Sequence, residues 1–376
     1  MSEFRFPLGL AQGEYFCNRV EETAHLLKNI QSRTHTVLIA PRRYGKTSLA
    51  YRAIEKSGLP FAKIDLYMCT SLLDIQKAIL KGVNALIAEI AGVTQKLLDS
   101  LRSFVKSLKL SLEANPDGFK LSLSPSHEST PSENICEALE ILDQILTKRA
   151  ISAVLLIDEF QEIELIAPNR GVEGAIRHAA QGAQNFSLIF SGSQRNLLKS
   201  MFNTRNKPLY RLCDEIVLER ISALDYQVFI NLFAEKKWGE PISDESFDAL
   251  IQLTQRHPYY ANALFKSLFD PDQEQAPSPE LIQMLWQDLT EKKRQDLLSE
   301  TSDLTLTQKK LLVAIANGIN QELTGKTFLS RSELSSSSVI KALEFLTEND
   351  FIELLNNQYR LIDPLLQTVI LQLQKI

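Results

Sequence analysis

The sequence has few of the features that are typical of zinc-stabilised, secreted or membrane-spanning proteins. Its 376 residues include four cysteines, which lie far apart and form no C-x-x-C pair, so neither a structural zinc site nor a disulfide framework is expected. No apolar run is long enough to cross a bilayer, and the first residues contain no signal-peptide core. We therefore expect a cytoplasmic protein with no membrane partner.

The sequence also has no excess of positive charge. Its formal net charge is -5 and its isoelectric point is about 5.7. This balance argues against a protein whose whole surface binds nucleic acid, although it is compatible with a local basic patch. The length predicts two or three domains, each with a sizeable core.

What the sequence does contain is a short apolar run that ends in a glycine-lysine-threonine turn. Residues 37–39 have the composition of a buried parallel strand, and a helical pattern resumes directly after the turn. The spacing from Ala40 to Thr47 fits the phosphate-binding pattern G-x-x-x-x-G-K-[ST], with Ala40 in place of the first glycine. Gly45 lets the backbone approach an anion, Lys46 supplies charge for the terminal phosphates, and the Thr47 hydroxyl suits Mg2+.

A second apolar run, residues 153–157, ends in two adjacent carboxylates, Asp158 and Glu159. Charges at the end of a buried strand are costly unless they meet a cation or water. Beside a phosphate-binding loop, Asp158 is predicted to hold Mg2+ through its water shell. Glu159 is predicted to orient or deprotonate the attacking water. The alternative for this pair is an ordinary strand end.

Strand and helix patterns alternate over the first 220 residues, which is typical of a parallel sheet. We expect an α/β fold of the P-loop NTPase type with a parallel five-stranded core sheet. Residues 95–131 interrupt it with an insertion. Polar and apolar residues alternate there on both sides of the turn signal 114–118, which predicts a hairpin, either a partner-binding element or a plain surface hairpin. The five strands are expected at residues 37–39, 61–66, 153–157, from 186, and 214–219.

Polar and basic residues follow the fourth and fifth predicted strands. Ser191, Ser193 or Gln194 is predicted to touch the γ-phosphate or the attacking water, and the sequence does not decide which one. Arg195 and Arg211 are both candidates for a cation that contacts the nucleotide, in cis or from a neighbouring subunit. The alternative for each is a solvated surface arginine. The residues predicted to be catalytic are Lys46, Glu159, Ser193 and Arg211, and the predicted metal ligands are Thr47 and Asp158.

From residue 221 the pattern becomes helical. Residues 221–300 predict an all-α helical lid with a proline-rich connector at 270–279. Residues 301–376 predict three helices and a small hairpin, which is the pattern of a winged-helix domain. We expect residues 15–220 to form the P-loop NTPase domain and residues 1–14 to be a loosely held N-terminal arm.

These motifs, in this order, resemble the archaeal-type ATPase family, in the STAND branch of the P-loop NTPases, which is related to AAA+ proteins and origin-recognition ATPases. The resemblance implies that the nucleotide is ATP, with adenine contacts near Asn18, Arg19, His257 and Pro258. Asn18, Ala40 and Arg256 stand where the family pattern has glycine. The segments that carry the resemblance are 16–22, 40–49, 155–161, 190–193, 208–211, 257–260 and 359–364. The predicted cofactor-binding residues are Asn18, Arg19, Pro41, Arg42, Arg43, Tyr44, Gly45, Lys46, Thr47, Ser48, His257 and Pro258.

The leading hypothesis is an ATPase that acts as a molecular switch, with slow, Mg2+-dependent hydrolysis of ATP to ADP. Its nucleotide state would control the lid and the winged helix, and thereby a protein partner or self-association. The alternative is an ATP-regulated DNA-binding protein of the origin-recognition type. The candidate recognition helix, 336–348, disfavours this because it offers only Lys341 against Glu344 and Glu348. A third reading, a scaffold without turnover, is disfavoured by the intact carboxylate pair.

Overall fold

The computed structural model describes residues 4–90, 111–114, 121–125 and 129–374. The chain divides into two compact units. The first, here called the sheet unit, comprises Arg19–Ala40 and Lys46–Leu218. The second, here called the helical unit, comprises Met1–Asn18, Pro41–Gly45 and Glu219–Ile376.

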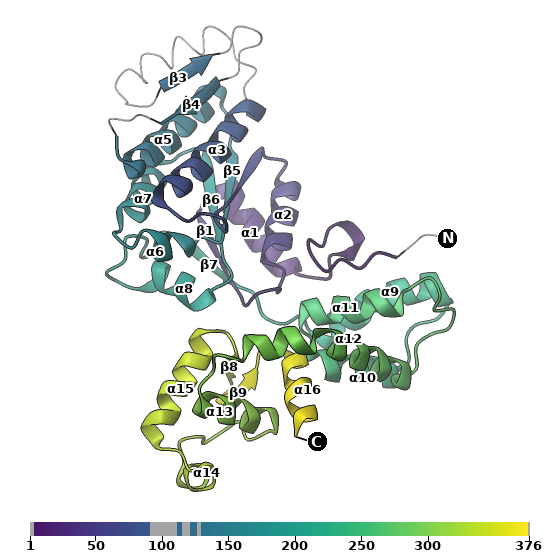
Figure 1. The fold of residues 1–376 in the computed structure, drawn as a ribbon. Helices are drawn as coiled ribbons and strands as arrows, with labels where there is room; N and C mark the ends of the chain where they lie inside the picture. The colour runs from purple at the N-terminus through teal and green to yellow at the C-terminus, as the bar shows by residue number, and fades with distance from the viewer. Residues whose placement is uncertain (1–3, 91–110, 115–120, 126–128, 375–376) are drawn as a thin grey trace. The chain divides into compact units, whose positions relative to one another are not determined.

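The sheet unit is built on a five-stranded parallel sheet (Figure 1). In spatial order its strands are β2 (Phe61–Asp65), β5 (Ala153–Asp158), β6 (Phe186–Ser191), β1 (Thr36–Ile39) and β7 (Asp214–Val217). Every residue of the three central strands is buried, as expected for parallel strands covered on both faces. The predicted α/β core with five parallel strands is therefore confirmed.

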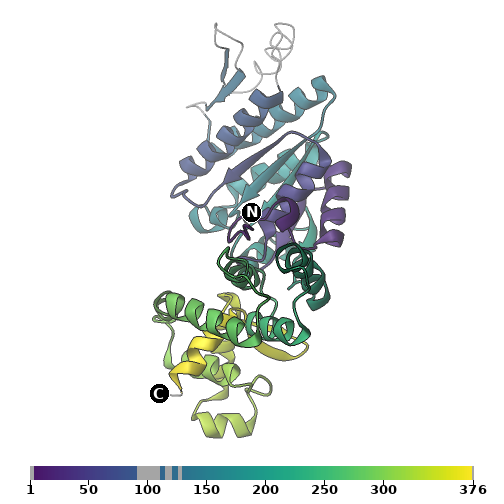
Figure 2. The ribbon, with the colours of Figure 1, turned by 90° about the vertical axis from the view of Figure 1, so that its right-hand side faces the viewer.

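Helices cover both faces of this sheet. In Figures 1 and 2, α3, α5 and α7 lie on one face, and α1 and α2 lie on the other. In α3, for example, Ile75, Ile79 and Val83 recur at helical spacing and are fully buried in the core. The helices of the sheet unit are α1 (Val20–Ser32), α2 (Lys46–Ser57), α3 (Leu72–Ile90), α5 (Pro131–Arg149), α6 (Glu162–Ile166), α7 (Gly171–Gly182) and α8 (Arg195–Asn203).

An antiparallel hairpin, β3 (Ser111–Ala114) and β4 (Leu121–Ser124), adjoins α3. The side-chain amide of Asn84 donates a hydrogen bond to the carbonyl oxygen of Leu123 at 3.0 Å, and its oxygen accepts one from the Leu123 backbone nitrogen at 2.7 Å. One α3 side chain thus fixes β4. This pairing falls within the insertion predicted at 95–131, of which residues 95–110, 115–120 and 126–128 lie outside the described residues.

The helical unit has one continuous apolar core, shared by the segment predicted as a lid and by the C-terminal segment. Trp286 is buried in this core and donates a hydrogen bond to the Thr368 hydroxyl at 3.0 Å, which joins helix Pro279–Glu300 to the last helix, Pro364–Leu373. No helix in the described part of the chain is both long and apolar enough to span a bilayer. After the short 3-10 turn Gly13–Tyr15, the elements are α9 (Ala223–Trp238), α10 (Asp244–Thr254), α11 (Pro258–Leu268), α12 (Pro279–Glu300), α13 (Leu306–Ala316), α14 (Lys326–Ser332), α15 (Ser336–Glu348), β8 (Ile352–Leu355), β9 (Gln358–Leu361) and α16 (Pro364–Leu373).

Two phenylalanines of the N-terminal segment, Phe4 and Phe6, pack in the helical unit, so the expectation of a loosely held arm is wrong for this part of it. Phe6 is 2% exposed, and the amide of Asn262 donates a hydrogen bond to the carbonyl oxygen of Pro7 at 3.2 Å. A buried aromatic ring brings more apolar area into the core than any other kind of side chain, which explains why this short segment stays attached. The Phe6 ring centre lies between 4.9 and 6.2 Å from those of Phe229, Phe233, Phe265 and Phe269.

Candidate nucleotide-binding site

The predicted phosphate-binding loop connects β1 to α2, which begins at Lys46. Gly45 has a φ of +88°, in the left-handed region where a side chain is strained, so the backbone itself requires glycine there. Lys46 is buried, and its ammonium group donates a hydrogen bond to the carbonyl oxygen of Ala40 at 2.9 Å. The lysine charge is thereby held at the loop, beside the start of α2.

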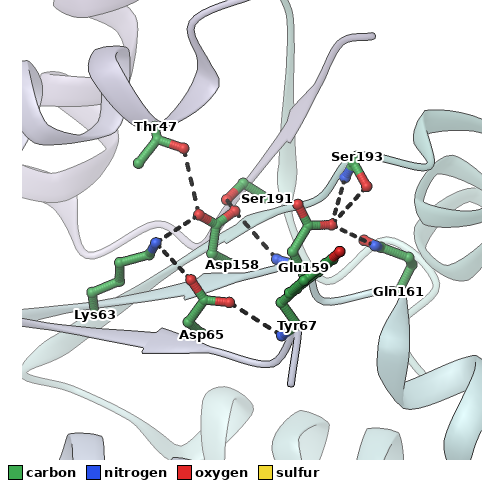
Figure 3. Close-up of polar contacts among 9 residues, drawn as sticks. All are labelled: Thr47, Lys63, Asp65, Tyr67, Asp158, Glu159, Gln161, Ser191 and Ser193. Carbon is green, nitrogen blue, oxygen red and sulfur yellow. Dashed lines mark hydrogen bonds and ion pairs between the residues drawn. The ribbon is translucent and has the colours of Figure 1, made fainter. Parts of the chain in front are cut away.

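Asp158, the last residue of β5, is the centre of a polar network (Figure 3). The Thr47 hydroxyl donates to its Oδ2 at 3.4 Å, and the Ser191 hydroxyl donates to its Oδ1 at 2.7 Å. The ammonium group of Lys63 lies 3.1 Å from Oδ2. The two predicted metal ligands, Thr47 and Asp158, are therefore adjacent, because α2 begins and β5 ends at the same edge of the sheet unit.

Glu159 follows in the left-handed region, with a φ of +52°. Its Oε2 accepts three hydrogen bonds, from the Gln161 side-chain amide at 2.6 Å, the Ser193 backbone nitrogen at 3.0 Å and the Ser193 hydroxyl at 2.7 Å. Of the three polar candidates after β6, Ser193 thus contacts Glu159, and Ser191 contacts the neighbouring aspartate. The third, Gln194, is exposed at the start of α8.

Two further residues of the network, Lys63 and Asp65, were not identified from the sequence. Residues two apart on a strand point to the same face, and Asp65 is the register partner of Asp158 on β5. The Lys63 ammonium lies 2.9 Å from an Asp65 oxygen and 3.1 Å from an Asp158 oxygen. Burial acts to lower the pKa of Lys63, but these two carboxylates outweigh it and raise the pKa above its ordinary value. Lys63 is therefore charged.

The donor set at the carboxyl end of β5 fits Mg2+. A threonine hydroxyl and an aspartate carboxylate are the hard oxygen ligands that this ion prefers. The Lys63 ammonium lies 3.1 Å from Oδ2 of the same carboxylate.

Comparison with solved structures identifies proteins of the same architecture. The Walker-type ATPase paby2304 of Pyrococcus abyssi is 18% identical, with a TM-score of 0.68 over 97% of this chain and 99% of that one. The ORC2 protein of Aeropyrum pernix, in its ADPNP-ADP complexes, is 12% identical, with a TM-score of 0.58 over 96% of each chain. The chain has the fold of these two proteins. Its membership of the STAND branch stays a prediction.

The C-terminal part of this ATPase fold is a winged helix. Residues 295–372 match the family model described as "Probable winged helix domain", and they contain α13 to α15, the β8–β9 hairpin and all but the last residue of α16. The predicted winged-helix module is therefore confirmed. None of the curated proteins matches the chain.

In the helical unit, the loop residue Tyr44 is buried against His257, with ring centres 4.9 Å apart. The guanidinium group of Arg43 lies over the Tyr259 ring, 4.4 Å from its centre. Burial, together with the charges of Arg220 and Arg43, lowers the pKa of His257 to about 3, so its ring is neutral. The other predicted cofactor-binding residues of this unit are Asn18, Pro41, Arg42, Gly45 and Pro258, the last of which begins α11.

Arg220 links the loop to the rest of the helical unit, and it was not identified from the sequence. Its guanidinium group donates to the Tyr44 hydroxyl at 3.1 Å, to the Gln255 carbonyl oxygen at 2.8 Å and to the Ile362 carbonyl oxygen at 2.9 Å. The side chain is 2% exposed. One buried arginine thus joins the loop, the end of α10 and the residue after β9 of the winged helix.

The remaining predicted residues lie at element boundaries. Asn18 and Arg19 have φ values of +51° and +62°, and the Arg19 guanidinium pairs with Glu22 at 2.8 Å. Asparagine tolerates the left-handed region better than most residues, which explains how Asn18 replaces the glycine of the family pattern. Ser48 is buried in α2. Arg211 is exposed, with its guanidinium group 5.1 Å from the Tyr210 ring centre, and among the described residues it contacts no member of the Asp158 network. Arg195 begins α8.

Proposed function

We propose that the chain binds ATP with Mg2+ and hydrolyses it slowly. The observation that carries this proposal is the network in which Thr47 and Ser191 hold Asp158 while Ser193 and Gln161 hold Glu159. It lies beside a loop of the phosphate-binding pattern, in the fold of Walker-type ATPases. The likeness to paby2304 and to a nucleotide complex of ORC2 supports the same nucleotide class.

Each residue of the network has a proposed role. Lys46 would exchange the Ala40 carbonyl oxygen for the terminal phosphates. Thr47 and Asp158 would hold Mg2+, which would neutralise phosphate charge. Glu159 would orient or deprotonate the attacking water, and Ser193 would position the Glu159 carboxylate. The three donors hold Oε2 of Glu159, so the other carboxylate oxygen, Oε1, would contact the attacking water.

Binding and hydrolysis can be tested separately. We expect Lys46→Ala to abolish ATP binding, whereas Glu159→Gln should bind ATP and hydrolyse it about 10²- to 10⁴-fold more slowly, as expected for loss of a general base. Lys56→Ala, at the exposed end of α2, is the matched control and should behave like the native protein. Turnover by Glu159→Gln at the native rate would refute the role of Glu159. Absence of ATP binding by the native protein would refute the function.

We further propose that nucleotide state is passed from the loop to the winged helix through Tyr44 and Arg220. The supporting observation is that Arg220 donates to the loop residue Tyr44 and also to the carbonyl oxygens of Leu361 and Ile362. A change in the loop that moves the Tyr44 hydroxyl must also change what Arg220 binds.

The proposed domains remain 15–220 for the ATPase, 221–300 for the lid and 301–376 for the winged helix.

The proposed output is a protein contact rather than DNA binding. On α15 the exposed residues include Ile340 and Phe345, which are 46% and 40% exposed. At the wing, Leu354 and Leu355 are 52% and 41% exposed. Apolar side chains suit a protein partner or self-association, because contacts to nucleic-acid phosphates require basic ones.

Amide hydrogen exchange tests the coupling. Addition of ATP with Mg2+ should change protection at β8, β9 and α16 in the native protein but not in Lys46→Ala. Tyr44→Phe removes only the hydroxyl that accepts from Arg220 Nε and should bind ATP normally while losing most of the change in the wing. An undiminished response in Tyr44→Phe would refute the coupling and leave the ATPase proposal intact.

A further inference from the structure

Lys63 occupies an unusual place for a lysine on an edge strand. Its side chain is only 29% exposed, and its ammonium group lies between Asp65 at 2.9 Å and Asp158 at 3.1 Å. The second contact is to Oδ2 of Asp158, the oxygen that also accepts the Thr47 hydroxyl. The ammonium group therefore lies at the same oxygen to which a divalent cation, held by Thr47 and Asp158, would be drawn (Figure 3).

We propose that Lys63 is a built-in competitor of the divalent cation at Asp158, and that it makes metal binding depend on the nucleotide. The inference rests on the proposed metal role of Thr47 and Asp158. A divalent ion without nucleotide would be repelled by the Lys63 ammonium group at the carboxylate oxygen that it must bind. An ion that arrives bound to the phosphates of ATP brings negative charge with it, so its repulsion from Lys63 is much weaker.

Asp65 has a defined part in this arrangement. It is the register partner of Asp158, and its carboxylate accepts hydrogen bonds both from Lys63 and from the Tyr67 backbone nitrogen at 3.1 Å. Asp65 is thus a fixed second partner, to which the ammonium group can remain bonded when Asp158 is taken by a metal ion. Without Asp65, Lys63 would have Asp158 as its one carboxylate partner in this network.

Substitutions of Lys63 and of Asp65 should change the affinity for the metal ion in opposite directions. Removing the Lys63 charge should strengthen metal binding, because the competitor is gone. Removing the Asp65 charge should weaken it, because Lys63 then has no alternative to Asp158. A merely structural ion pair would give no such opposition, since breaking it from either side would have the same effect on the site.

Binding of Mn2+ without any nucleotide, measured by electron paramagnetic resonance on the full chain, tests the first substitution. We expect Lys63→Met to bind Mn2+ at least about tenfold more tightly than the native protein, and the double variant Lys63→Met, Asp158→Asn to lose this gain. Lys77→Met is the matched control, because Lys77 pairs with Asp74 on α3 and is 73% exposed. Equal Mn2+ affinities of Lys63→Met and the native protein would overturn the proposal, as would a gain that survives Asp158→Asn.

The second substitution uses a non-hydrolysable ATP analogue. The Mg2+ concentration that gives half-maximal binding of the analogue should rise severalfold in Asp65→Asn and fall in Lys63→Met. A shift in the same direction for both variants would overturn the proposal. Lys63→Gln provides a second neutral variant if Lys63→Met does not fold. Because the Mn2+ measurement uses no ATP, failure of the ATPase proposal would be seen in the native protein and failure of this one in the variants.

Discussion

Gly192 controls the surroundings of Glu159 by having no side chain. A Cβ atom at this position would lie 2.0 Å from Oε1 of Gln161 and 3.1 Å from its Cδ. Gln161 is 1% exposed and donates to Glu159 at 2.6 Å, so it cannot move away without releasing the carboxylate. The close approach of β6 and the segment after β5 therefore requires glycine.

Gly192→Ala should slow ATP hydrolysis by about tenfold or more while leaving ATP binding intact, because Gln161 would be pushed off Glu159. The added methyl group should also cost about 1–3 kcal/mol of unfolding free energy, as overpacking usually does. Hydrolysis rates and binding of a labelled ATP analogue check the first point, and urea unfolding checks the second.

Gly174→Ala is the control for this substitution. Gly174 lies within α7, and nothing lies within 4 Å of an added Cβ. Alanine should therefore leave hydrolysis unchanged and raise the unfolding free energy by up to about 1 kcal/mol. Equal hydrolysis rates in Gly192→Ala and Gly174→Ala would contradict the role assigned to Gln161.

His257 predicts how the helical unit responds to acid. Its ordinary pKa of 6.5 is lowered to about 3 by burial and by Arg220 and Arg43, and its Nδ1 has no hydrogen-bond partner among the described residues. Below pH 6.5 the unfolded chain takes up a proton that the folded unit does not, so acid removes stability. Because of this histidine, the unfolding free energy of the helical unit should fall by about 2 kcal/mol between pH 7.5 and pH 5.0.

His257→Gln should remove that part of the acid dependence. Both tryptophans of the chain, Trp238 and Trp286, belong to the helical unit, so urea unfolding followed by tryptophan fluorescence reports on this unit. The difference in unfolding free energy between pH 7.5 and pH 5.0 should be about 2 kcal/mol smaller in the variant. An identical difference in both proteins would show that His257 titrates normally.

At the residue scale, the sequence predicted the groups whose partners are local. The loop motif and the strand-end carboxylates placed Thr47 and Asp158 correctly beside each other, because parallel strands bring their carboxyl ends to one edge. Lys63 and Arg220 were not predicted. Arg220 gave no signal, because a single arginine after a strand is common and its partners lie up to 176 residues away. Lys63 had a weak signal, the alternation of Lys63 and Asp65 along a strand.

At the element scale, prediction followed the strength of the hydrophobic pattern. The largely apolar strands β5 and β6 were identified readily. α7 was not, because two of its five buried residues are alanines and a third is the acidic Glu173. These residues give a weak apolar signal, and packing against α5 stabilises the helix.

The N-terminal segment shows the same limit and yields a prediction. Phe6 has no periodic pattern around it, yet it is buried among four phenylalanines of the helical unit. Phe6→Ala should therefore lower the unfolding free energy of this unit by about 3–5 kcal/mol, measured by tryptophan fluorescence in urea. Leu8→Ala, at a side chain that is 42% exposed, should change it by less than about 0.5 kcal/mol.

At the scale of the whole molecule, charge distinguishes the two proposed outputs of the winged helix. The chain carries a net charge of -5, and residues 301–376 contain seven basic residues against eight acidic ones. On α15, Lys341 is exposed together with Glu344 and Glu348. In the wing, Arg360 is paired with Glu353 at 2.7 Å. Neither element offers an unopposed row of positive charge, which phosphate contacts require.

We therefore expect weak, sequence-independent binding to duplex DNA, with a dissociation constant above about 10⁻⁶ M at physiological salt, in the range of non-specific association. Titrations at several salt concentrations, with and without ATP, check this through both the affinity and its salt dependence. Glu344→Lys provides a positive control, because reversing one charge on α15 should strengthen binding and steepen the salt dependence by about one released counterion or more. Sequence-specific binding tighter than about 10⁻⁸ M by the native protein would instead favour the DNA-binding alternative. In that case we would expect serines 335–338, at the start of α15, to contact the bases. Their exposed hydroxyl groups can bond to base edges and add no charge.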